Sequence, residues 1–219
     1  MDYGVQFNKL MYERLMSGGD ITLFSPNDVP GLYDAFFQDQ DKFRELYEAA
    51  ERKTSIRKKK ISATELFSAF MQERKDTGRI YLQNVDHANE HSSFKTDVAP
   101  IKQSNLCCEI DLPTKPLDDI NDVTGEIALC TLSAINWGSF ANPEDMEKAC
   151  TLAVRGLDAL LSYQNYPIIA AQMATENRRP LGVGIINLAY FLAKNDTSYS
   201  DPEALKLVDT WAQHWSYYL

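Results

Sequence analysis

The sequence predicts an α/β fold, in which helices alternate with short strands. Apolar residues recur at three- and four-residue spacing in several segments, which is typical of helices packed on a core. Shorter runs rich in β-branched and aromatic residues lie between these segments and are typical of strands. The chain has 219 residues, of which 44% are hydrophobic and 24% charged, a balance that supports a core without disulfides. Strands that alternate with helices along one chain indicate α/β architecture.

The first segments are expected to be mainly helical. Apolar spacing predicts a helix over residues 2–16, which a pair of glycines ends. A short apolar run at 21–24 leads to a turn at 25–28, and one helix is expected over 30–47, opened by its proline. The basic run 57–60 is interpreted as the solvated approach to a further helix.

That further helix is predicted to begin at Ser62, with Glu65 as the partner in a capping box. The run 79–84 is rich in strand formers and predicts a strand, whereas 85–100 is polar and is expected to be irregular. Three aspartates mark 117–125 as an acidic loop.

The second half repeats the alternation. Residues 127–135 and 181–186 predict strands, the second of them buried and leading into a helix. Asn142 followed by Pro143 is typical of a helix start. The last helix is expected over 201–219 and looks cut before its natural end. Its predicted apolar stripe consists of Leu205, Val208, Ala212, Trp215 and Leu219.

Composition excludes several classes of protein. The 22 Lys and Arg stand against 31 Asp and Glu, and a net charge of -9 argues against a general nucleic-acid binder. Four unevenly spaced cysteines do not form a secreted disulfide framework and suit a reducing cytoplasm. No signal peptide is recognised, and the longest apolar run, 181–193, is too short for a membrane span.

Two further patterns, a histidine pair and a glycine pair, do not predict a binding site. His87 and His91 have the spacing of metal ligands on a helix, but the segment is expected to be a loop, so no metal site is predicted. The glycines of 182–184 lack the third glycine of a dinucleotide fingerprint, and a packing turn between strand and helix is the preferred interpretation.

Chemistry is concentrated in residues 105–109, Asn-Leu-Cys-Cys-Glu. In extended backbone, successive side chains point to opposite faces, so Asn105, Cys107 and Glu109 would share one face. An amide, a thiol and a carboxylate that project together combine a hydrogen-bonding group, a redox-capable sulfur and a general base. The alternative is a buried structural thiol on a strand, flanked by polar residues with ordinary partners.

The longer stretches around these residues resemble a known family. Residues 104–117, Ser-Asn-Leu-Cys-Cys-Glu-Ile-Asp-Leu-Pro-Thr-Lys-Pro-Leu, and 125–134, Gly-Glu-Ile-Ala-Leu-Cys-Thr-Leu-Ser-Ala, closely resemble the large, catalytic subunit of class I ribonucleotide reductase. The resemblance extends over essentially the whole chain. It implies that residues 1–219 are a partial catalytic barrel domain, an incomplete part of a ten-stranded α/β barrel with its cysteine-bearing finger loop. The activity cone, the half with the phosphate loop and the C-terminal tail are not recognised.

The resemblance also implies residue roles. Cys107 matches the cysteine that becomes a thiyl radical and takes hydrogen from the ribose 3′ carbon, and Glu109 matches the base that takes the 3′-hydroxyl proton. Asn105 matches the amide that binds the ribose hydroxyls. Cys130 matches one of two cysteines that reduce the substrate, with its partner in a segment absent here. The residues expected to line the substrate are Ser104, Asn105, Leu106, Cys107, Cys108 and Glu109. Cys108 and Cys150 are otherwise expected to be core residues.

The same resemblance implies partners. They are a ribonucleoside diphosphate substrate, the missing large-subunit segments, a small (beta) subunit whose metal centre supplies the radical, and thioredoxin or glutaredoxin. No cofactor, nucleic acid or membrane is expected to bind this segment. The alternative function is that of a catalytically inactive remnant that serves only as a subunit-interaction piece.

Overall fold

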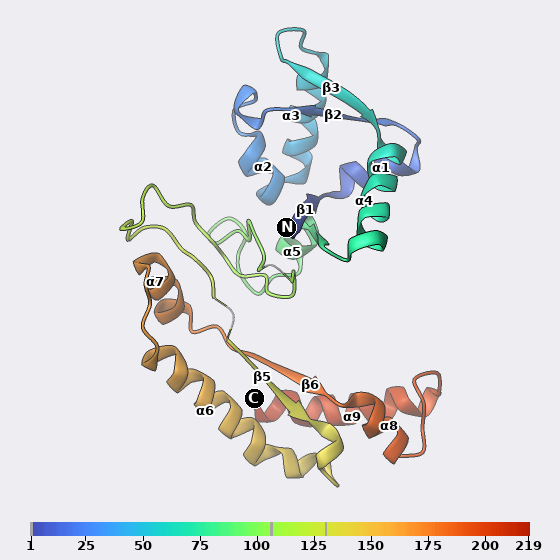
Figure 1. Ribbon diagram of the computed structural model, residues 1–219, viewed down its shortest axis with the longest axis vertical. Helices are drawn as coiled ribbons and strands as arrows, with labels where there is room; N and C mark the ends of the chain where they lie inside the picture. The colour runs from blue at the N-terminus through green and yellow to red at the C-terminus, as the bar shows by residue number, and fades with distance from the viewer. Residues whose placement is uncertain (1, 106, 130) are drawn as a thin grey trace. The chain divides into compact units, whose positions relative to one another are not determined.

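The computed structural model describes residues 2–105, 107–129 and 131–219. The chain divides into two compact units, Met1–Pro116 and Leu117–Leu219, here called unit 1 and unit 2 (Figure 1). Helices alternate with short strands in both units, as predicted. The described strands form three two-stranded sheets, and none of these closes into a barrel.

Unit 1 contains two of these sheets. Strands β1 and β4 pair in parallel, from Tyr3 opposite Ile80 to Phe7 opposite Asn84, whereas β2 and β3 pair antiparallel. The described elements are β1 (Tyr3–Phe7), α1 (Lys9–Met16), β2 (Asp20–Phe24), the 3-10 turn η1 (Pro26–Asp28), α2 (Leu32–Gln38), α3 (Gln40–Arg52), β3 (Lys58–Ser62), α4 (Ala63–Thr77), β4 (Ile80–Asn84) and α5 (Val85–Glu90).

The start of the chain differs from the predicted helix over 2–16. Residues 3–7 form β1, and the helix begins only after Asn8. The reason is long-range, because the backbone of β1 is paired with β4, about eighty residues further along the chain. On the buried side, the Phe7 ring lies 4.7 Å from Phe67, centroid to centroid, so β1 also covers α4.

The expected single helix over 30–47 is two helices. The chain breaks at Asp39, whose backbone is extended and whose Oδ1 accepts a hydrogen bond of 2.9 Å from Lys42 N. Asp39 therefore caps α3, which satisfies a free N–H of its first turn. The predicted capping box at Ser62 is wrong, because the Ser62 side chain makes no capping hydrogen bond in the described structure. Helix α4 nevertheless begins where expected.

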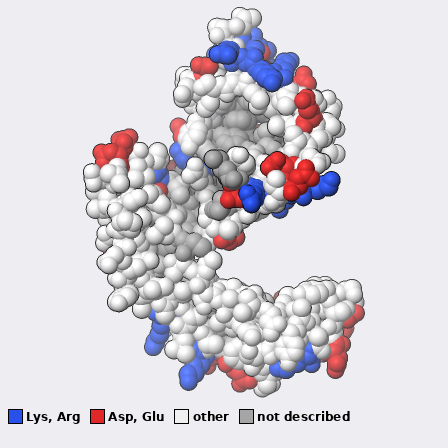
Figure 2. Space-filling model, in the orientation of Figure 1, with Lys and Arg blue, Asp and Glu red and all other residues white. Residues whose placement is uncertain are grey.

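The basic run 57–60 precedes a helix as predicted, but its residues 58–60 belong to strand β3, which leads directly into α4. Arg57, Lys59 and Lys60 are exposed, in agreement with a solvated run. Basic side chains gather over β3 and the loop before it, as Figure 2 shows. Lys58 is not simply solvated, because its Nζ donates to the carbonyl oxygens of Glu51 and Lys53, both at 2.6 Å. A cation at the end of α3 stabilises carbonyl groups that have no partner inside the helix.

Unit 2 is built on one parallel pair of strands, with Leu132 opposite Gly182 and Asn136 opposite Ile186. Its described elements are β5 (Leu132–Asn136), η2 (Trp137–Ser139), η3 (Pro143–Met146), α6 (Glu147–Tyr163), α7 (Ile169–Arg178), β6 (Gly182–Ile186), α8 (Leu188–Lys194) and α9 (Pro202–Tyr218). The first predicted strand is shorter than expected, since residues 127–129 are not part of it. The glycines of 182–184 lie inside β6 and not in a turn.

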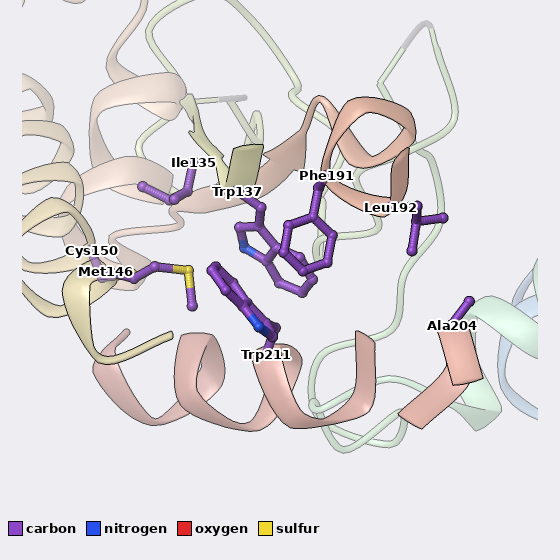
Figure 3. Close-up of a cluster of buried hydrophobic side chains, with 8 residues drawn as sticks. All are labelled: Ile135, Trp137, Met146, Cys150, Phe191, Leu192, Ala204 and Trp211. Atoms are coloured by element: carbon purple, nitrogen blue, oxygen red, sulfur yellow. The ribbon is translucent and has the colours of Figure 1, made fainter. Parts of the chain in front are cut away.

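Aromatic rings fill the core of unit 2. The rings of Trp137, Phe191 and Trp211 face one another between β5, α8 and α9 (Figure 3), with Phe191 and Trp211 centroids 4.6 Å apart. Cys150 is fully buried beside them, which confirms its prediction as a core residue. The whole cluster consists of Ile135, Trp137, Met146, Cys150, Phe191, Leu192, Ala204 and Trp211.

The predicted stripe of α9 is only partly correct. Val208, Ala212 and Trp215 pack against the core, but Leu205 and Leu219 are exposed. The buried residues of α9, Ala204 and Trp211, both lie outside the stripe. Strand β6 was expected to be buried, and in the described structure its Ile186 is instead half exposed.

Candidate functional site

Around Cys107 and Cys108 the described backbone forms a tight turn and not an extended strand. Ser104 and Asp111 form an antiparallel bridge at its base. At its tip, Cys108 N donates to the carbonyl oxygen of Asn105 at 3.1 Å, and Cys108 has a left-handed backbone with φ 61°. The expected alternation of faces over 105–112 is therefore wrong, because a left-handed residue reverses the chain where a strand would continue.

The side chain of Asn105 holds this turn together. Its Oδ1 accepts hydrogen bonds from the backbone N–H groups of Glu109 and Ile110, both at 3.1 Å. The Oγ of Ser104 donates to the carbonyl oxygen of Ile110 at 2.9 Å. An asparagine that bonds to backbone a few residues ahead stabilises a turn in place of regular secondary structure.

The turn brings most of the predicted site residues together. Cys107 and Glu109 are both exposed, two residues apart, while Ser104 and Asn105 are half-buried beneath them. A thiol and a carboxylate therefore lie on one turn, and the role of each stays a prediction. Leu106 and Cys130 lie outside the described residues, so the structure does not place these two predictions.

Cys108 is not the core residue that was expected. It is half-buried, and burial raises the pKa of its thiol, with the carboxylates of Asp111 and Glu109 raising it further. Cys107 and Cys108 together line a hollow of about 460 Å³, which α4 and β4 complete with Arg74 among other residues. The hollow therefore adjoins the exposed Cys107 thiol.

Residues that the sequence did not single out anchor the turn. Asn89 of α5 is buried, and its Nδ2 donates to the carbonyl oxygen of Ile101 at 2.9 Å while its Oδ1 accepts from Ile101 N at 2.8 Å. Gln83 of β4 is also buried and donates to Asp111. The available signal was an uncharged amide within an apolar run, as in Ile-Tyr-Leu-Gln, since a buried amide needs partners.

The two histidines do not lie in a loop as expected. His87 is in α5, His91 directly follows it, and their ring centroids are 5.9 Å apart. Among the residues that the structure describes, no three His, Cys, Asp or Glu side chains gather closely enough to hold a metal ion.

Comparison with known proteins identifies the family. The model of the family described as "Ribonucleotide reductase, barrel domain" matches residues 1–219. The chain belongs to this family. It is 60% identical over 219 residues to a protein named ribonucleoside-diphosphate reductase subunit alpha from Haemophilus influenzae. It is also 60% identical over 219 residues to ribonucleoside-diphosphate reductase 1 subunit alpha from Escherichia coli.

A viral relative is also similar. The subunit alpha of Enterobacteria phage T4 is 52% identical over 209 residues, which are 94% of this chain and 27% of that protein. The bacterial matches cover 100% of this chain but only 29% of the relatives. The chain is thus an α/β segment of the ribonucleotide reductase barrel domain, which confirms the resemblance seen in the sequence. In the part of the barrel segment that the structure describes, no helix is long and apolar enough to cross a membrane.

Proposed function

We propose that this ribonucleotide reductase segment supplies the reacting cysteine loop of a ribonucleoside-diphosphate reductase alpha subunit. The observation that carries the proposal is the exposed Cys107 thiol on a turn that also exposes Glu109. A thiol that exchanges a hydrogen atom with a sugar carbon must reach the substrate, and its base must reach the same sugar.

The proposed chemistry begins when the beta subunit, with its metal centre, supplies a radical to Cys107. The thiyl radical takes a hydrogen atom from the ribose 3′ carbon, which forms an S–H bond and leaves a carbon radical. Glu109 accepts the proton of the 3′-hydroxyl, and one thiol of the pair formed by Cys130 and a second cysteine gives a proton to the 2′-hydroxyl, which leaves as water. The pair then supplies two electrons and its second proton, so that the 2′ carbon gains a hydrogen and the pair becomes a disulfide. Glu109 returns its proton to the 3′ oxygen, and Cys107 returns the hydrogen atom to the 3′ carbon.

Asn105 fits a substrate-binding role as well as a structural one. The turn engages its carbonyl oxygen, and the amide nitrogen on the same group is a donor suited to a ribose hydroxyl. The proposed substrate-lining set is Ser104, Asn105, Leu106, Cys107, Cys108 and Glu109. The proposed partners are the remaining alpha segments, the beta subunit, and thioredoxin or glutaredoxin as reductant in the cytoplasm.

The test replaces single thiols in a complete alpha subunit that carries this segment and is assayed with its beta subunit and reductant. Cys107→Ser should abolish formation of deoxynucleotide, whereas Cys108→Ser, the adjacent control, should retain most of it. Glu109→Gln should lower turnover by about 100-fold or more, since it keeps the shape but removes the proton acceptor. Full turnover by Cys107→Ser would refute the proposal.

The second candidate is a piece that only binds other subunit segments. The exposed apolar side chains on β6 and α6, such as Ile186 and Leu160, favour contact with further protein. This candidate predicts that Cys107→Ser and wild-type segments assemble alike and that neither contributes to turnover, so the same assay separates the two.

A further inference from the structure

Two side-chain amides, from the partly buried Gln6 and the buried Gln83, join the β1–β4 sheet to the neck of the cysteine turn, here defined as Lys102 and Asp111. Gln6 Nε2 donates to the carbonyl oxygen of Lys102, which enters the turn, at 2.6 Å. Gln83 Nε2 donates to Asp111 Oδ1, on the side that leaves the turn, at 2.8 Å. The two glutamines are joined by a hydrogen bond of 2.7 Å from Gln6 Nε2 to Gln83 Oε1.

The direction of this chain is fixed by chemistry. A backbone carbonyl and a carboxylate can only accept hydrogen bonds, so both glutamines must turn their nitrogen atoms toward the neck. The oxygen of Gln83 then faces the nitrogen of Gln6. Each amide therefore has a single orientation that satisfies all of these contacts at once.

The sheet holds the two glutamines in place. Gln6 and Gln83 are partners in the parallel register of β1 and β4, so their side chains are cross-strand neighbours. Gln83 is only 7% exposed. A buried amide that loses its partner is strongly penalised, so this arrangement resists distortion.

We propose that Gln6 and Gln83 are positioning residues that clamp both sides of the turn neck and so set where the Cys107 thiol lies. The inference rests on the proposed function, which gives Cys107 its reacting role. The turn itself spans only the residues between the clamped positions and contains the left-handed Cys108. Without the hydrogen bond from Gln83, Asp111 no longer ties the turn to the sheet. The turn then loses a contact that keeps Cys107 exposed and Cys108 half-buried.

The test exchanges the donor and the acceptor of the hydrogen bond between Gln83 and Asp111. Gln83→Glu sets a second carboxylate against Asp111, where the wild type has a hydrogen bond, and should release the neck. Adding Asp111→Asn to Gln83→Glu restores a donor, because the asparagine can donate to the new glutamate while Gln6 Nε2 still donates to it. A role confined to general stability predicts that the labelling changes only when the β1 and β4 amides lose their protection from hydrogen exchange, whereas the clamp predicts a change while they stay protected.

The readout is the ratio of iodoacetamide alkylation rates at Cys107 and Cys108 in the 219-residue chain, measured by mass spectrometry under native conditions. Cys107 should react faster in the wild type, because it is exposed and the Cys108 thiol has a raised pKa. Gln83→Glu should lower this ratio by about threefold or more, since a hydrogen bond to a charged group is lost. The double variant should return it to the wild-type value.

Gln72→Glu is the matched control. Gln72 donates to Asp76 at 2.6 Å on the exposed surface of α4, so the substitution has the same chemistry away from the turn and should leave the ratio unchanged. Hydrogen exchange of β1 and β4 amides shows whether unit 1 stays folded. If Gln83→Glu unfolds unit 1, the double variant decides the test. A folded double variant with the wild-type ratio of Cys107 to Cys108 alkylation supports the inference, and a folded double variant with a lower ratio refutes it.

An unchanged ratio in a folded Gln83→Glu variant, or a double variant no better than the single one, would overturn the inference. The turnover of the complete alpha subunit with Cys107→Ser separates this failure from failure of the proposed function. If Gln83→Glu changes the labelling ratio but Cys107→Ser keeps full turnover, the proposed function is refuted and the clamp is supported. If Gln83→Glu leaves the labelling ratio unchanged but Cys107→Ser loses turnover, the clamp is refuted and the proposed function is supported.

Discussion

Replacing Asn89 by leucine should destabilise unit 1 through two stranded backbone groups. Asn89 accepts from Ile101 N at 2.8 Å and donates to Ile101 O at 2.9 Å, and both residues are buried. Leucine has a similar size but neither donor nor acceptor. The N–H and the C=O of Ile101 would then be buried without these partners.

The expected loss follows from the number of stranded groups. An unsatisfied buried polar group costs about 1–3 kcal/mol, so two groups predict a loss of about 2–6 kcal/mol in the free energy of unfolding. Small domains have only about 5–15 kcal/mol in total, so unit 1 should unfold at clearly lower urea concentration. The Ile101 amide should lose its protection from hydrogen exchange first.

The assay uses the separation of chromophores between the two units. All three tryptophans, Trp137, Trp211 and Trp215, belong to unit 2, so their fluorescence serves as an internal reference that should not change. Hydrogen exchange of unit 1 amides in urea gives the stability of unit 1. Asn27→Leu, at an exposed turn, is the control and should change stability by less than about 0.5 kcal/mol. A loss below about 1 kcal/mol for Asn89→Leu, with Ile101 still protected, would refute the reasoning.

Two further predictions concern a glycine pair and an ion pair. A Cβ on Gly138 would lie 2.6 Å from Tyr190 Cδ1, so Gly138→Ala should destabilise unit 2 by about 1–3 kcal/mol in tryptophan-monitored unfolding. Gly156 in α6 has nothing within 4 Å of that position, and Gly156→Ala should stabilise unit 2 by about 0.5–1 kcal/mol, so equal effects would contradict the packing argument. Burial acts to raise the pKa of Glu51, but hydrogen bonds from Arg14 and Thr22 outweigh it and lower the pKa. The resulting stability is present above the unfolded pKa of about 4.3 and is lost as the pH falls through the lower folded pKa. In Arg14→Met, the free energy of unfolding of unit 1, measured with urea, should no longer fall with pH through this range. Lys42→Met, which removes an exposed ion pair with Glu45, is the control and should keep the fall.

Local chemistry explains which parts of the fold were predictable. Asn142–Pro143 correctly marks a helical start, although it opens the 3-10 segment η3, which leads into α6 at Glu147. Asp201–Pro202 marks the start of α9, because proline favours the first position of a helix. Strand β1 was missed because its partner β4 lies far away in the sequence, and apolar spacing over so few residues suits either structure. The break at Asp39 was overlooked although an aspartate cap was present in the sequence.

The candidate site shows the same division. Its residues were found through a family resemblance and a plausible grouping of side chains, but the grouping relied on an extended backbone that does not exist. The left-handed backbone conformation of Cys108 is uncommon for a residue other than glycine, and the neighbouring residues do not predict it. Asn89 and Gln83 escaped notice because their role depends on Ile101 and Asp111, which only the folded chain brings to them.

The parallel pairing of β1 with β4 has a consequence for synthesis on the ribosome. Tyr3 pairs with Ile80, so β1 leaves the ribosome long before its partner does. At about 5–20 residues per second, the first strand waits roughly 4–15 seconds before it can pair. Helices α1 to α3 and the antiparallel β2–β3 pair depend on nearer residues and can form during that interval. The sheet that carries the glutamine clamp therefore forms after these elements, and until then the open edge of β1 is available to chaperones or to other chains.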